Sequence, residues 1–112
     1  MKTKKTQEWI KKTFDYSFSD QSLVENALTH RSFSYNNNER LEFLGDSALD
    51  LVISEVLFEK YLEESEGNLS RMRANLVNQE SLSEIAREIH LDQYLILGKG
   101  EKKSGGHNRD SI

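Results

Sequence analysis

The sequence predicts an all-α domain, and three observations support that prediction. The chain contains no proline. Its apolar residues recur at spacings of three and four, which is the period of one helix face. No stretch alternates between apolar and polar residues for long enough to predict a strand. With 112 residues, of which 36% are hydrophobic, the chain can form one helical bundle with one modest core.

Two short helices are expected near the N-terminus. The first covers residues 6–14. The second begins at Ser19 and Asp20, whose side chains can cap it, and its apolar positions run to Leu28. The polar stretch of residues 34–38 interrupts the helical pattern, so we expect a loop there.

The longest expected helix covers residues 39–61 or 39–62. We expect it to stop at residues 64–68, where Gly67 and Asn68 can adopt turn conformations. The next helix carries Leu69, Met72 and Leu76 at helical spacing.

The C-terminal third contains one further helix signal. Ser81, followed by Glu84 three residues later, matches a capping box. The buried stripe of that helix is expected to consist of Leu82, Ile85, Ala86 and Ile89. Residues 91–97 form a short apolar segment. Residues 98–106 predict an exposed, mobile loop in which basic residues outnumber acidic ones. Residues 108–112 are typical of the cap and first turn of a helix that does not continue, so we expect a chain truncated at its C-terminus.

The composition excludes several classes of protein. With 15 Lys and Arg against 19 Asp and Glu, the net charge is −4, and the chain lacks the basic footprint of a simple nucleic-acid binder. The absence of cysteine excludes disulfides, thiolate metal sites and thiol nucleophiles. No apolar run approaches the roughly 18 residues of a membrane span, and no signal peptide is recognisable. We therefore expect a cytoplasmic protein with no membrane partner, in which any nucleic-acid binding is local or metal-assisted.

The most informative segment is residues 39–47, Glu-Arg-Leu-Glu-Phe-Leu-Gly-Asp-Ser. On a helix at about 100° per residue, Glu39 and Asp46 lie within about 20° of each other. Glu42 lies on the same side, and Asp50 follows one turn later. Like charges at i,i+4 spacing destabilise an isolated helix by about 0.2–0.5 kcal/mol per pair. We therefore expect a compensating cation or partner.

The remainder of this helix is apolar nearly all round, which predicts that it is largely buried. Its expected core positions are Leu41, Leu44, Ala48, Leu51 and Val52, and Leu49 and Ile53 flank the acidic face. Carboxylates that converge on a buried helix favour a hard divalent cation such as Mg²⁺. The alternative is an ordinary solvated face whose acids pair with Arg40, Arg71 or Arg73.

Three segments, in this order, carry a resemblance to a known family. They are residues 27–32 (Ala-Leu-Thr-His-Arg-Ser), 38–47 (Asn followed by the acidic segment) and 66–74 (Glu-Gly-Asn-Leu-Ser-Arg-Met-Arg-Ala). Together they closely resemble the bacterial ribonuclease III catalytic domain, and the resemblance continues through residues 97–101, 104–106 and 111–112. It implies an all-helical endonuclease domain over residues 1–112, incomplete at its C-terminus and without the double-stranded RNA-binding domain that usually follows.

The resemblance also implies roles for individual residues. Glu42 and Asp46 match metal-binding, catalytic carboxylates of the family. Glu39 and Glu66 match accessory acidic positions that place RNA or a second metal. Phe43 matches the aromatic residue that inserts into the partner subunit of the family dimer, and its alternative is plain core packing. The family's other two metal carboxylates lie beyond the position of Ile112, so we expect half of the metal shell to be missing, and we give Asp110 little weight as a substitute ligand.

Other polar residues are weaker candidates. Lys99, Lys102, Lys103 and Arg109 can contact phosphates, or they can simply be solvated. Of the histidines, His30 is interpreted as a capping or packing residue, His90 lies at an expected helix end, and His107 has no functional constellation around it.

The leading hypothesis is a Mg²⁺-dependent endoribonuclease, with Mn²⁺ as a substitute metal and no organic cofactor. The resemblance implies a homodimer that cleaves double-stranded RNA, including rRNA and mRNA precursors, to leave 5′-phosphate and 3′-hydroxyl ends. The first alternative is a non-catalytic helical dimerisation or RNA-contact fragment. The second is a solvated helical domain whose acidic face has no function.

Overall fold

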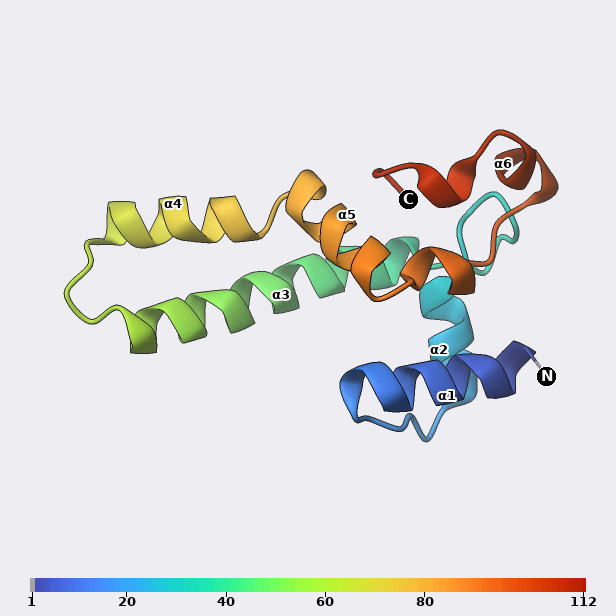
Figure 1. Cartoon of the computed structure of the whole chain (residues 1–112), viewed down its shortest axis with the longest axis horizontal. Helices are drawn as coiled ribbons and strands as arrows, with labels where there is room; N and C mark the ends of the chain where they lie inside the picture. Colours follow the sequence, from blue (N-terminus) through green and yellow to red (C-terminus); the bar gives the residue numbers. More distant parts are fainter. Residues whose placement is uncertain (1) are drawn as a thin grey trace.

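A computed structural model describes residues 2–112 and shows an all-α fold (Figure 1). No strand forms within these residues, which confirms the predicted fold class. The α-helices are α1 (Lys2–Phe14), α2 (Gln21–Leu28), α3 (Glu39–Lys60), α4 (Glu66–Leu76), α5 (Gln79–Glu88) and α6 (Lys99–Lys103), and the 3₁₀ helices are η1 (Leu91–Tyr94) and η2 (Gly106–Asn108). None of the helices in residues 2–112 is both long and apolar enough to span a membrane.

The molecule is elongated, with principal extents of 49 × 31 × 24 Å. Helices α3 and α4 form an antiparallel hairpin that projects away from the rest of the chain, and the other helices gather around the N-terminal end of α3 (Figure 1). Within the hairpin, Arg73 Nη1 donates a hydrogen bond to Ser54 Oγ at 2.7 Å, and Leu57 is buried. The first half of α3, outside the hairpin contacts, lies beside the helices of the C-terminal third of the chain.

Local signals explain the two N-terminal helices. Asp20 is the N-cap of α2, as predicted, because its carboxylate accepts hydrogen bonds from the amides of Ser22 and Leu23. Helix α1 begins at Lys2, four residues earlier than the predicted start. Ile10 is buried, and the indole of Trp9 stacks on Tyr94 of η1 with ring centroids 4.3 Å apart, so α1 is docked onto the C-terminal third of the chain.

A short backbone bridge joins residues that are distant in sequence. His30 N donates to Ile96 O and Ile96 N donates to Leu28 O, both at 2.9 Å, so Thr29 and Ile96 form an isolated parallel bridge. Leu97, next to the bridge, is 1% exposed and is the most deeply buried side chain. The bridge therefore fixes the end of α2, and the loop that leads into α3, against residues 95–98.

The predicted starts of α4 and α5 are both wrong by a few residues. Gly67 and Asn68 lie inside α4, because Ser65 is its N-cap and accepts a hydrogen bond from Asn68 N at 3.1 Å. Helix α5 is capped by Asn78, whose Oδ1 accepts from Ser81 N at 2.9 Å. Because Asn78 already caps the helix, Ser81 lies in the first turn, and the predicted capping box does not form.

The prediction of a loop over residues 98–106 is also wrong, although most of these residues are exposed as expected. This segment contains α6 and the start of η2, and Gly106 is buried. A Cβ atom on Gly106 would lie 2.8 Å from Glu101 O, so the close fit of this segment requires glycine. Residues 110–111 form a turn and do not begin an α-helix.

The predicted burial of α3 and α5 is wrong for most of their apolar positions. Leu44, Leu51 and Val52 of α3 are 65%, 69% and 57% exposed, and Leu82 and Ile85 of α5 are also exposed. Within residues 39–60, Leu57 alone is buried. The helical period identifies an apolar face, but no element of residues 2–112 covers this one.

Candidate functional site

The acidic residues of interest project from the first half of α3, whose start is fixed by the preceding loop. Asn38 N donates to Thr29 O at 2.9 Å, and Asn38 Nδ2 donates to Ala27 O at 3.2 Å. Asn37 Oδ1 accepts from Glu39 N at 3.0 Å. These bonds tie the first turn of α3 to the end of α2, so the Asn-rich loop positions the acidic face.

Glu42 and Asp46 line one cleft of about 550 Å³, as their i,i+4 spacing predicts. The cleft lies between the first half of α3, helix α5, η1 and the segment after α6. Its other polar lining residues include Asp92, Asp110, Arg87 and His107, and its apolar lining includes Leu41, Leu82, Leu91 and Leu95.

A second, polar cleft of about 360 Å³ adjoins the first. Glu39 and Glu42 line it together with His30, Arg31 and Arg109. Glu42 lines both clefts and therefore lies where they meet. The structure therefore brings Glu39, Glu42 and Asp46 to one end of α3. We call the larger cleft the acidic cleft.

The carboxylates of Glu42 and Asp46 have no hydrogen-bond or ion-pair partner among residues 2–112, and both residues are exposed. Two of the arginines considered as their partners are engaged elsewhere: Arg71 donates to Asn68 Oδ1, and Arg73 donates to Ser54 Oγ. The face is solvated, as the alternative holds, but its pairing with Arg40, Arg71 or Arg73 is not observed among residues 2–112.

The donor set suits a hard cation. Carboxylate oxygens are preferred Mg²⁺ ligands, and Mg²⁺ sites often use one or two protein carboxylates while the ion keeps several waters. Glu42 and Asp46 supply two such groups, free of competing partners. Among residues 2–112 there is no group of three or more His, Asp or Glu side chains arranged to hold a metal.

Glu66 is not brought to the acidic cleft. It lies in the first turn of α4, at the far end of the α3–α4 hairpin. There it lines a different groove, with Phe58 and Leu69 among its neighbours. Phe43 lies on the solvent-exposed face of α3 and is 80% exposed, so the alternative of core packing is wrong for this residue.

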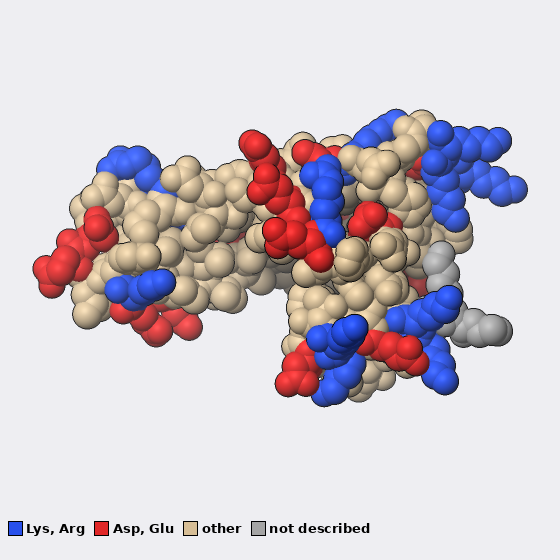
Figure 2. Space-filling view, viewed as in Figure 1, with Lys and Arg blue, Asp and Glu red and all other residues tan. Residues whose placement is uncertain are grey.

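The candidate phosphate contacts differ in their surroundings. Lys99, Lys102 and Lys103 are exposed on α6, where Figure 2 shows a concentration of basic side chains. Arg109 instead donates to Glu101 Oε1 at 2.8 Å and to Ser104 Oγ at 3.0 Å. The three lysines are therefore free to contact an anion, whereas Arg109 is held by the protein.

The histidine expectations are met in part. His30 Nδ1 lies 2.8 Å from Ser32 Oγ and accepts a hydrogen bond from Ser32 N, which is a local capping contact. His90 follows α5 with a φ of 63°, at the helix end as expected. His107 has a hydrogen-bond partner that its sequence neighbours do not predict, because its Nδ1 donates to Asp92 O at 2.6 Å.

Sequence reasoning missed Arg87 and Asp92 as lining residues of the acidic cleft. Arg87 donates to the carboxylate of Asp110 and to Asn108 O, the latter at 3.3 Å. The one available signal was the i,i+4 spacing of Ser83 and Arg87, which puts both side chains on one face of α5.

Comparisons with known proteins identify the family of the chain. A family model described as Ribonuclease-III-like matches residues 20–112. The chain is 54% identical over 108 residues to a protein named Ribonuclease 3 from Methylococcus capsulatus, covering 96% of this chain and 47% of that protein. It is 58% identical over 98 residues to the Ribonuclease 3 of Bordetella pertussis, covering 88% of this chain and 38% of that protein.

The fold is also similar to a solved structure. The nuclease domain of ribonuclease III from Campylobacter jejuni matches with a TM-score of 0.89 and 44% identity, over 93% of this chain and 73% of that chain. That domain is described as having structural flexibility in a region involved in dimer formation. The chain spans less than half the length of the two curated relatives above.

Proposed function

The chain belongs to the ribonuclease III family, and from that premise we propose that it is the nuclease part of a Mg²⁺-dependent endoribonuclease that cleaves double-stranded RNA. One observation carries the proposal: Glu42 and Asp46 line the same cleft without protein partners. Two free carboxylates one helical turn apart repel each other, and a divalent cation removes that repulsion while using both as ligands.

Glu42 and Asp46 are proposed to hold the ion, with Mn²⁺ able to replace Mg²⁺ and no organic cofactor involved. When bound, such an ion supplies an activated water for in-line attack on phosphorus and stabilises charge on the leaving 3′ oxygen. Glu39 borders the adjoining cleft, where it can orient the RNA backbone or a second ion. The products are proposed to carry 5′-phosphate and 3′-hydroxyl ends. Glu66 is proposed to act away from this cleft, at the end of the hairpin where it lies.

The substrate is proposed to be recognised mainly by its shape. A-form RNA exposes phosphates and 2′-hydroxyl groups across a wide, shallow minor groove. Lys99, Lys102 and Lys103 form an exposed basic group that can contact those phosphates. Natural substrates of this class include rRNA and mRNA precursors, and we propose that the protein acts on them in the cytoplasm. In this proposal Glu42 and Asp46 hold the catalytic ion, and α6 helps to hold the duplex.

Assembly into a homodimer is part of the proposal. Phe43 is 80% exposed, and further apolar side chains of α3 are exposed with it. Several large apolar side chains exposed on one helix are typical of an interaction surface. The same exposed face supports a second candidate function, a non-catalytic module that dimerises or contacts RNA without turnover.

The two candidates are separated by a cleavage assay. A long double-stranded RNA, a matching single-stranded RNA and a DNA duplex are incubated with the protein in Mg²⁺, and the product ends are labelled. The proposal predicts cleavage of the RNA duplex alone, with 5′-phosphate ends, and loss of cleavage in Glu42→Gln and Asp46→Asn. Binding of the RNA duplex without any cleavage would favour the second candidate.

A further inference from the structure

Residues 107–112, which we call the terminal segment, are fastened to three different elements. His107 Nδ1 donates to Asp92 O of η1 at 2.6 Å. Arg109 forms an ion pair with Glu101 of α6 at 2.8 Å. Asp110 forms an ion pair with Arg87 of α5. Each of these bonds is modest by itself, but together they tie the terminal segment to η1, α6 and α5.

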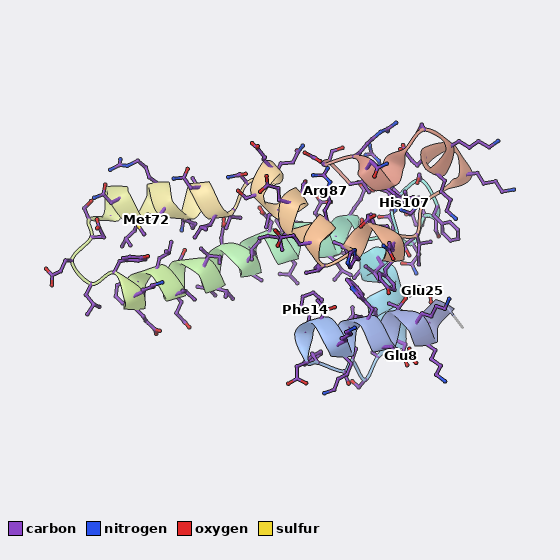
Figure 3. The ribbon with its side chains drawn as sticks, in the orientation of Figure 1. Glu8, Phe14, Glu25, Met72, Arg87 and His107 are labelled. Carbon is purple, nitrogen blue, oxygen red and sulfur yellow. The ribbon has the colours of Figure 1, made fainter. Side chains whose placement is uncertain are left out.

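The link to α5 involves three side chains and two backbone carbonyl groups. Arg87 Nη2 donates both to the carboxylate of Asp110 and to Asn108 O. Ser83, one turn earlier on the same face of α5, donates from Oγ to Asp110 O at 3.2 Å. Asp110 is therefore held through its side chain and its main chain. Figure 3 shows Arg87 on α5 close to the segment that carries His107.

The terminal segment forms one wall of the acidic cleft. His107, Asp110 and Ile112 line the same cavity as Glu42 and Asp46 on α3. Asp110 brings a carboxylate into a cleft that already has three others, from Glu42, Asp46 and Asp92. Arg87 forms an ion pair with Asp110 and so offsets the charge of this fourth acid.

We infer that Arg87 is a positioning residue that holds the terminal segment on α5 and thereby sets the wall of the acidic cleft opposite Glu42 and Asp46. The effect of Arg87 on cleavage rests on the proposed function. The placement of the terminal segment by Arg87 does not rest on it, so this placement can be tested without metal or RNA.

The first measurement is hydrogen exchange of the whole chain. Arg109 N donates to Gly106 O and Ile112 N donates to Arg109 O, so both amides report on the segment. Because the ion pair is partly exposed, Arg87→Ala and Asp110→Ala are each expected to speed exchange at these amides roughly 3- to 10-fold. Arg71→Ala is the matched control, because Arg71 donates to Asn68 on α4, remote from the cleft.

The second measurement separates positioning from general stability. In amide NMR spectra, Arg87→Ala should shift the signals of Glu42 and Asp46 across the cleft as well as those of the terminal segment, and leave α4 unchanged. The exchanged pair Arg87→Asp with Asp110→Arg should return both the exchange rates and the Glu42 and Asp46 signals toward wild type. Arg87→Lys, which keeps the charge but has a shorter reach, should restore them in part.

Two results would overturn the inference. One is an exchange rate in the terminal segment that Arg87→Ala leaves unchanged. The other is an exchanged pair that folds, as judged by circular dichroism, but does not recover the wild-type signals. Neither result bears on whether Glu42 and Asp46 bind metal, so a failure here is distinct from a failure of the proposed function.

Discussion

Trp9 Nε1 donates a hydrogen bond to the carbonyl oxygen of Ile89 at 2.7 Å, across 80 residues of sequence. The same indole stacks on Tyr94 and meets Phe14 edge to face. A part-buried indole with both a hydrogen-bond partner and a stacking partner fixes its helix in place. Helix α1 is therefore an integral part of the end of the molecule that carries the acidic cleft.

This relationship predicts the effect of Trp9→Phe. The substitution keeps an aromatic ring near Tyr94 but removes the donor to Ile89 O, leaving a part-buried carbonyl without its partner. The free energy of unfolding should fall by about 1–2 kcal/mol. Urea denaturation followed by circular dichroism measures the change, with Lys12→Ala on the exposed side of α1 as the control. An unchanged midpoint for Trp9→Phe would contradict this prediction.

The close approach of residue 98 to the loop before α3 makes a second prediction. A Cβ atom on Gly98 would lie 2.2 Å from Ser32 O, a backbone atom that cannot move aside alone. Gly98→Ala should therefore destabilise the fold by about 1–3 kcal/mol through overpacking. The matched control is Gly100→Ala, because nothing lies within 4 Å of a Cβ at Gly100 and alanine favours the helix. Equal stability of the two variants would show that the fit at Gly98 is looser than described.

The N-cap of α2 predicts a pH dependence. The Ser22 hydroxyl, followed by the amides of Leu23 and Ser22, donates to Asp20 and lowers the pKa of its carboxyl. A folded-state pKa below the unfolded value means that this stabilisation is complete above the unfolded pKa and is lost as the pH falls through the folded pKa. Asp20→Asn keeps a capping oxygen but removes the titration.

Thermal unfolding from neutral pH to about pH 2 checks this expectation. The advantage of wild type over Asp20→Asn should decline once the pH is below about 4. A difference that is constant over the whole range would contradict the role assigned to the charge of Asp20.

The basic group on α6 predicts a salt-dependent contribution to RNA affinity. Replacing Lys99, Lys102 and Lys103 together by alanine should weaken binding to all RNA duplexes alike and reduce the salt slope by roughly one for each lost phosphate contact. Arg109→Ala should have a smaller effect, because Arg109 is held by Glu101. Lys60→Ala, at the far end of α3, is the control. An unchanged salt slope in the triple variant would exclude α6 from the RNA interface.

Local chemistry explains what could be predicted of the fold. Asp20 caps α2 as expected because an N-cap depends on the next three residues alone. The start of α5 was misplaced because Asn78 and Ser81 are both capping residues and lie three positions apart. The structure of residues 98–106 could not be predicted from local signals, because Gly98 is placed by contact with Ser32, 66 residues earlier.

For the candidate site, too, only the features that depend on local sequence could be predicted. The helical period places Glu42 and Asp46 on one face, and the structure has them lining one cleft. Asp92, His107 and Asp110 reach that cleft through contacts distant in sequence, so no spacing rule identifies them. For the exposed face of α3, the helical period identifies an apolar stripe but does not show which element or partner covers it.

The most direct test of the proposed function is the initial rate of double-stranded RNA cleavage as a function of Mg²⁺ concentration. Wild type is compared with Glu42→Gln, Asp46→Asn and the control Glu59→Gln, which makes the same change of charge on an exposed position of α3. We predict Mg²⁺-dependent cleavage by wild type and Glu59→Gln, and losses in both cleft variants larger than the roughly 10- to 100-fold typical of a lost outer-shell partner. Cleft variants that cut at the wild-type rate would contradict the proposal, and folded wild-type protein that binds the RNA duplex without cutting it would favour the non-catalytic module.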